Sequence, residues 1–189
     1  FSGSIISLYL VYHSGINSIK TKKPVRHFVR AFSAVGCVVL YIFGLKYLLL
    51  SENIAIAHSA PIIAALLAVP ILGEKIGIHR MLAIVVGFIG VLVIVKPGTD
   101  LFQLKSLLPI GSAFFMASVY LTTRSLMNTE SSTSIVFYYS FALLFTSLIF
   151  FPSDFVIPDA FNLTLALSLG IMGSMGHYFM SQAARHADV

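Results

Sequence analysis

Residues 51–98 read SENIAIAHSAPIIAALLAVPILGEKIGIHRMLAIVVGFIGVLVIVKPG, and this stretch decides the fold. It holds two apolar runs, 54–73 and 77–96, separated by a short charged turn. A helix needs roughly 20 apolar residues to cross about 30 Å of hydrocarbon, and both runs are long enough. The runs are continuous and lack the alternation of a barrel strand. The stretch therefore predicts two helices that cross a membrane in opposite directions.

The same pattern continues on both sides of this pair. Further apolar runs of spanning length cover 31–50, 107–126, 132–152 and 163–183. Residues 1–12 are apolar but too short to cross, so we expect the second half of a helix whose start is missing. The other end, AARHADV, stops without a closing segment, and we expect the chain to be a fragment. The predicted fold class is an all-α membrane protein, a helical bundle with about six full spans and one partial span.

The composition supports this class and excludes two others. Of the 189 residues, 58% are hydrophobic and only 10% are charged, whereas a typical soluble domain has about 25% charged residues. So few charges cannot cover a surface that faces water, and the 16 Phe residues argue against a disordered chain. The single Cys excludes a disulfide framework and a cysteine-based zinc cluster, and no metal site is predicted.

The basic residues indicate the orientation, because Lys and Arg concentrate in the cytoplasmic loops of membrane proteins. We expect the loop 13–30 to be cytoplasmic in a bacterial inner membrane. Its basic residues are Lys20, Lys22, Lys23, Arg26 and Arg30. We interpret the net charge of +5 as a topology signal, with anionic lipid as the partner of residues 20–30. Nucleic acid is not an expected partner.

Two short segments suggest an internal repeat. GLKYL at 44–48 and AARHA at 183–187 each end a helix with a small residue, a base and an aromatic ring. The predicted orientation places these two helix ends on opposite sides of the membrane. Related segments in opposite orientations are typical of secondary transporters built from inverted repeats.

The stretch 51–98 resembles the EamA-type repeat of the drug/metabolite transporter superfamily. The matching features are a small-residue helix with a central Pro, a Leu-Gly-Glu-Lys turn that contains Glu74, and a Gly-x-x-Gly-Val helix that ends in Lys-Pro-Gly. The resemblance implies a multi-pass permease of ten helices in two inverted repeats. Residues 1–98 would then form the end of the first repeat, and 99–189 the start of the second. The resemblance also implies a structural role for Glu74 in the turn.

Small residues predict close packing between the two helices of 54–96. Ala60, Ala64 and Ala68 recur at four-residue spacing and form a smooth ridge. Gly87 and Gly90 form a notch on the following helix. In lipid, such residues let helix backbones approach and gain van der Waals contact.

A first candidate binding site lies at Pro61. A proline inside a spanning helix removes one backbone donor and crowds the carbonyl of Ala57, so we expect a kink beside His58 and Ser59. Irregular backbone at membrane depth is tolerated where it is buried or lines a cavity. Two interpretations stay open: His58 and Ser59 line a substrate cavity, or His58 bonds to a neighbouring helix.

A second candidate site is a polar stripe in the run 163–183. Ser174, His177 and Ser181 recur at helical spacing, so this face turns inward to a cavity or to a partner helix. Tyr41 lies on the face of the segment 33–48 that we expect to oppose this stripe at the repeat interface.

Tyr120, in the run 107–126, is a further candidate for lining the cavity. The alternative for Tyr120 is plain helix packing.

These observations favour a secondary transporter of small polar organic metabolites that works by alternating access between its repeats. The chain has no nucleotide-binding motif, and no cofactor or catalytic residue is expected. Its acidic residues all fall near helix ends or in loops, so His58 and His177 are the only titratable groups expected deep in the spans. The spans also lack the several Lys or Arg residues that a phosphate would require. Amino acids and related neutral, zwitterionic or cationic solutes are therefore favoured.

Three alternatives stay open. The arrangement KTKKPVRHFVRAF at 20–32 resembles the S-adenosylmethionine uptake carriers of the same superfamily. An intramembrane hydrolase built on Ser174 and His177 would need an orienting partner for the base and donors for an oxyanion, and neither is visible. The third alternative is a membrane scaffold that transports nothing.

Overall fold

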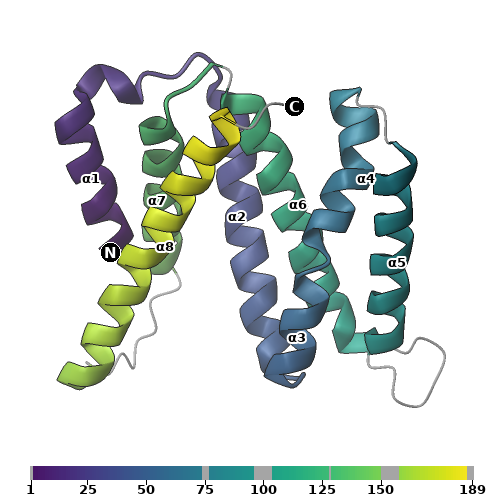
Figure 1. The fold of residues 1–189 in the computed structure, drawn as a ribbon. Coiled ribbons are helices and arrows are strands. Elements are labelled where there is room, and N and C mark those ends of the chain that lie inside the picture. Colours follow the sequence, from purple (N-terminus) through teal and green to yellow (C-terminus); the bar gives the residue numbers. More distant parts are fainter. Residues whose placement is uncertain (1, 74–76, 96–103, 128, 150–157, 187–189) are drawn as a thin grey trace. The chain divides into compact units, whose positions relative to one another are not determined.

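The computed structural model describes residues 2–73, 77–95, 104–127, 129–149 and 158–186 (Figure 1). These residues form helices and connections, with no strand among them. In chain order, the helices are α1 (Ser2–Ser14), η1 (Ile16–Ile19), α2 (Pro24–Leu45), α3 (Leu50–Ala57), α4 (Ala60–Leu72), α5 (Ile78–Val95), η2 (Leu104–Ser106), α6 (Leu107–Met127), α7 (Ser132–Ile149) and α8 (Ala160–His186).

Six helical segments of the described chain are long and apolar enough to cross a membrane. They are Pro24–Leu45, Leu50–Ile71, Ile78–Val95, Leu104–Met127, Ser132–Ile149 and Ala160–Ala183. The predicted all-α membrane fold is confirmed, and α1 is too short to span, as expected.

The start of α2 differs from the prediction, because α2 begins at Pro24 and not at residue 31. Proline suits the first turn of a helix, where its missing N–H leaves no bond unmade and its φ already fits. His27 and Arg30 therefore lie within the spanning helix. We predicted both in the preceding loop, and this prediction is wrong.

The helix pair α3 and α4 forms one span with a break at His58 and Ser59. We predicted a kink with Pro61 inside a continuous helix, and this detail is wrong. Instead α3 ends at Ala57 and a new helix begins at Ala60, which places Pro61 in its first turn. There the missing proline N–H costs no intrahelical hydrogen bond, and the Ser59 carbonyl accepts from the N–H groups of Ile62 and Ile63.

The chain divides into two compact units. Unit 1 comprises residues 1–32 and 122–189, and unit 2 comprises residues 33–121. Helices α2 and α6 each contribute to both units. A compact unit need not coincide with a sequence repeat, so the predicted repeats 1–98 and 99–189 stay a prediction.

In unit 1, helix α1 lies beside α7 and α8 (Figure 1). A Cβ on Gly3 would lie 2.6 Å from Ser174 Oγ, and a Cβ on Gly170 would meet the side chain of Ser2. These two glycines let α1 and α8 cross closely. The Ser4 hydroxyl donates to the Ser140 carbonyl at 3.3 Å, which joins α1 to α7.

The side chains of α1 are distributed in the reverse of a soluble helix. Its buried residues are Ser2, Ser4, Ser7 and Val11. Its outward-facing residues Ile5, Leu8, Tyr9 and Tyr12 are 52% to 85% exposed. Small polar groups therefore face the neighbouring helices, and large apolar groups face outward.

In unit 2, α4 packs against α5 through small residues. Ala60 and Ala68 are buried, and a Cβ on Gly87 would meet the side chain of Ile62. The predicted notch is therefore present at Gly87. At Gly90 the prediction is corrected, since no described atom lies within 4 Å of where its Cβ would be. The prediction for Glu74 falls outside the described residues.

Candidate functional site

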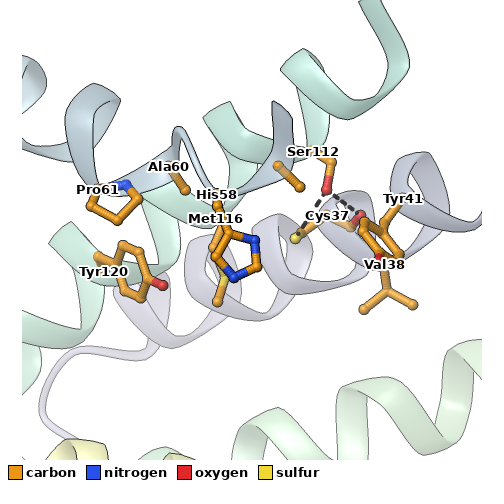
Figure 2. A pocket seen from close by; sticks show the side chains of 10 residues that line it. Cys37, Val38, Tyr41, His58, Ala60, Pro61, Ser112, Met116 and Tyr120 are labelled. Atoms are coloured by element: carbon orange, nitrogen blue, oxygen red, sulfur yellow. Dashed lines mark hydrogen bonds between the residues drawn. The ribbon is translucent and has the colours of Figure 1, made fainter. Parts of the chain in front are cut away.

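Unit 2 contains a cavity of about 360 Å³ between α2, α3, α4 and α6 (Figure 2). Three of the predicted site residues, Tyr41, His58 and Tyr120, line it together. Figure 2 shows His58 with Tyr120 on one side and Tyr41 on the other. The full lining is Cys37, Val38, Tyr41, Ala57, His58, Ala60, Pro61, Ser112, Met116 and Tyr120.

The helix break determines how His58 enters this cavity. His58 follows the last residue of α3, and its Nδ1 lies 2.9 Å from the Ile54 carbonyl. The ring is anchored on one side and exposed on the other, so it can present Nε2 to a ligand. Ser59 is buried beside it but does not line the cavity.

The lining of this cavity is mostly apolar and aromatic. Ser112 is already engaged, because its hydroxyl donates to the Cys37 carbonyl at 2.9 Å and lies 3.4 Å from Cys37 Sγ (Figure 2). No Asp, Glu, Lys or Arg occurs among the residues that line this cavity in the described chain. Such a surface suits the uncharged or aromatic part of an organic solute.

Among the lining residues that were not predicted are two on α6, Ser112 and Met116. They precede Tyr120 at intervals of four residues on α6, so the three side chains share one helix face. Extending the helical period backward from Tyr120 would have found them.

Unit 1 contains a second cavity, of about 300 Å³, between α1, α7 and α8. The predicted residues Ser174 and His177 line it, whereas Ser181 is fully buried away from it. The polar part of the lining is Ser2, Ser4, Tyr139, Ser140, Ser147, Ser174 and His177. This cavity is richer in hydroxyl groups than the cavity of unit 2.

His177 is partnered by an aromatic ring. Its imidazole lies 4.3 Å from the Tyr139 ring, centroid to centroid, and its Nδ1 is buried without a hydrogen-bond partner in the described structure. No hydrogen bond joins Ser174 to His177 in the part of the chain that the structure describes.

A buried guanidinium also contacts the Tyr139 ring. Arg30 Cζ is 5.2 Å from the centre of that ring, and Arg30 is only 1% exposed. One buried cation does not contradict the expectation that the spans lack several Lys or Arg residues, but the expectation that Arg30 lies in a cytoplasmic loop is wrong. The reason is the earlier start of α2, which carries Arg30 into the bundle.

His27 and Glu130 form a second buried polar group. Glu130 Oε2 is 3.9 Å from His27 Nε2, and Glu130 Oε1 accepts from the Lys22 N–H at 2.8 Å and from the Thr21 hydroxyl at 3.1 Å. His27 and Glu130 are 4% and 5% exposed, whereas His58 is exposed. The expectation that His58 and His177 are the only buried titratable groups is therefore wrong.

The two cavities belong to different units, so the predicted opposition of the Tyr41 face and the Ser174 stripe stays a prediction. The structure groups Tyr41, His58 and Tyr120 in one cavity, and Ser174 and His177 in the other.

Comparison with known proteins gives a family. The sequence pattern of the EamA-like transporter family matches residues 1–96. The chain belongs to this family. With its six candidate spans, this EamA-like chain is an integral multi-pass membrane protein.

Curated relatives of this EamA-like chain transport different solutes, by their names. A riboflavin transporter of Vibrio cholerae is 31% identical over 90% of the chain and 58% of its own length. An S-adenosylmethionine uptake transporter of Rickettsia felis is 29% identical over the whole chain and 64% of its own length. A pseudopaline exporter of Pseudomonas aeruginosa is 26% identical over 97% of the chain and 65% of its own length. The chain thus spans about three-fifths of the length of these relatives, and no solved structure matches it.

Proposed function

We propose that this chain forms part of a secondary transporter that carries small polar organic metabolites across a bacterial inner membrane. The observation that supports it is the cavity of unit 2, where two tyrosines and one imidazole surround a space without charged side chains. Neutral, zwitterionic or cationic solutes, amino acids included, suit this lining better than phosphorylated ones. The family membership supports transport rather than catalysis.

As an alternative to amino acids, the transported solute is S-adenosylmethionine. Several relatives named as S-adenosylmethionine uptake transporters align with the full length of the chain. The named solutes of these relatives and of the riboflavin transporters contain heteroaromatic rings, which could stack on Tyr41 or Tyr120. Stacking would orient such a ring without requiring a charge in this cavity.

Alternating access is the proposed mechanism, driven by a solute gradient or by exchange. Residues 13–23 would face the cytoplasm, with anionic lipid against the basic side chains of Lys20, Lys22, Lys23 and Arg26; Arg30 is buried and takes no part.

Solute counterflow in proteoliposomes tests this function with the full-length protein. The test solutes are S-adenosylmethionine, riboflavin and a set of neutral and aromatic amino acids. We expect one labelled solute to show saturable exchange, and Tyr120→Ala to lower that exchange by roughly three- to tenfold through lost stacking. Tyr120→Phe keeps the ring and retains most of the activity. Tyr12→Ala, at a side chain 85% exposed, is the matched control.

Two results would contradict the proposal. One is the absence of exchange for every solute by a protein that remains folded. The other is a Tyr120→Ala variant that exchanges solute like wild type, which would remove the cavity of unit 2 from the pathway.

The hydrolase alternative has its own test. A hydrolase that uses Ser174 as nucleophile would lose its activity in Ser174→Ala. A transporter keeps its flux in Ser174→Ala but loses it in His177→Phe, where the ring of the cavity no longer offers a hydrogen bond. A scaffold would show no flux in either variant or in wild type.

A further inference from the structure

Arg30 is a charged side chain in the interior of a spanning segment. It lies on α2 and is 1% exposed. Placing a charge there is costly, so intramembrane Arg residues usually pair with another group or face a pathway. The partners of Arg30 therefore indicate what the charge does.

The hydrogen bonds of Arg30 leave its charge without a counter-ion. Its Nε donates to Thr123 Oγ1 at 2.7 Å, and its Nη1 donates to the Ile135 carbonyl at 3.1 Å. Its Nη2 is buried and has no hydrogen-bond partner in the described structure. Both partners are neutral, and no carboxylate pairs with Arg30 among the described residues. A buried guanidinium without an anion leaves a positive potential in its surroundings.

Two neighbouring rings connect Arg30 to the cavity of unit 1. The Tyr139 ring lies 5.2 Å from Arg30 Cζ, and its centre is 4.3 Å from the centre of the His177 ring. Tyr139 and His177 both line the cavity. Around it, His177 Nδ1 and the Ser140 hydroxyl are buried without hydrogen-bond partners in the described residues. The cavity thus combines unused polar atoms with a nearby positive charge.

We propose that the cavity of unit 1 binds the carboxylate group of the transported solute. Arg30 supplies the counter-charge, while His177 and the Ser140 hydroxyl, which have no hydrogen-bond partners in the described residues, supply hydrogen bonds. One guanidinium balances the single charge of a carboxylate, whereas a phosphate monoester carries more charge and would require further cations. This inference rests on the proposed function and narrows the solute class to molecules that carry a carboxylate, zwitterions in particular.

Matched solute pairs test the inference, with counterflow by the full-length protein as the readout. Each pair differs by the carboxylate alone: S-adenosylmethionine and its decarboxylated form, and phenylalanine and phenethylamine. We expect wild type to prefer the carboxylate-bearing member by roughly tenfold, the effect of one opposite charge nearby in a protein interior. In Arg30→Gln that preference falls to about one, and Arg30→Lys retains part of it.

Two control variants separate charge from structure. Arg26→Gln removes an exposed guanidinium one turn earlier on α2 and leaves the preference unchanged. Thr123→Val removes a hydrogen bond of Arg30 but not its charge, so the preference also persists, even where the rate falls.

The outcomes distinguish this inference from the proposed function. If Arg30→Gln lowers both members of a pair equally, Arg30 only ties α2 to α6 and α7, and the inference is overturned. If Arg30→Gln does not fold, competition on wild type decides, and equal inhibition by both members overturns the inference. Exchange limited to solutes without a carboxylate, such as riboflavin, overturns the inference but leaves the proposed function intact. Absence of exchange for every solute overturns both.

Discussion

Glu130 accepts the hydrogen bonds that join two connecting segments of unit 1, the one before α2 and the one between α6 and α7. Its Oε1 accepts from the backbone of Lys22 and from Thr21 just before α2, while Glu130 itself lies between α6 and α7. Both donors are partly buried and the Glu130 side chain is 2% exposed, so loss of this acceptor costs free energy. The carboxylate therefore stabilises the start of α2, and with it the position of Arg30.

We expect Glu130→Ala to lower the free energy of unfolding by about 2 kcal/mol, because the Lys22 N–H and the Thr21 hydroxyl then lose their acceptor. Glu130→Gln keeps one oxygen and should cost less than half as much. The measurement is thermal unfolding of the purified protein in detergent. Glu52→Ala is the matched control, since Glu52 also accepts from a backbone N–H, that of Leu49 at 3.4 Å, but at an exposed site. Equal losses in both Ala variants would show that burial of Glu130 does not matter.

At the scale of residues, the sequence predicted some of the side chains that line the cavities but not which charged side chains are buried. Residue types and helical spacing grouped Ser174 with His177, and both line the cavity of unit 1. They also selected Tyr41, His58 and Tyr120, which line the cavity of unit 2. The burial of His27, Arg30 and Glu130 was missed, since a basic residue near a helix end has the same appearance in a sequence whether it faces lipid headgroups or the bundle. Pro24 was the available signal, because a proline at the first turn moves the helix start toward it.

At the scale of elements, close contacts between α1 and α8 depend on glycine. A Cβ on Gly170 would meet the Ser2 side chain and would lie 3.7 Å from the Gly3 backbone N. Gly176 lies further along the same helix, with no described atom within 4 Å of its Cβ position. The two positions therefore separate the effect of packing from that of helix propensity.

We predict that Gly170→Ala lowers the free energy of unfolding by about 1–3 kcal/mol, because α1 and α8 must separate to admit the methyl group. Gly176→Ala should be neutral or slightly stabilising, since alanine favours the helix. Thermal unfolding of both variants in the same detergent checks this. A loss at Gly176 as large as that at Gly170 would refute the packing argument and indicate that another surface covers Gly176.

The spans themselves were predictable because length and continuous apolarity reflect the thickness of the bilayer. All six predicted runs overlap the candidate spans of the structure. The break between α3 and α4 was less accessible to sequence reasoning. Hydropathy does not distinguish a kinked helix from two half-helices, because both bury the same side chains, and the backbone around Pro61 decides between them.

At the scale of the whole molecule, the orientation in the membrane is the property that the sequence predicts and that calls for experiment. The exposed basic residues before α2 should face the cytoplasm. If so, one crossing along α2 would place Leu49 outside, and the alternation of the spans would place the start of α8 outside as well.

Single cysteines in a Cys37→Ser background test this orientation in intact cells with a membrane-impermeant maleimide. We expect Leu49→Cys and Asn162→Cys to react at once, because both positions are exposed and the predicted orientation places them outside. Lys20→Cys should react only after the cells are lysed. The reverse pattern would invert the topology, and labelling of all three variants in detergent confirms that each thiol is reactive.

Because the serines of α1 face inward, its large side chains face outward, and this affects how the protein behaves outside a bilayer. Its large side chains Ile5, Leu8, Tyr9 and Tyr12 are stable facing outward only while hydrocarbon surrounds them. In buffer without detergent, this apolar surface is exposed to water, and the molecules would aggregate through it before any helix unfolds. Loss of activity on detergent removal should therefore appear as precipitation of helical protein, with the far-ultraviolet circular dichroism of the sediment largely preserved.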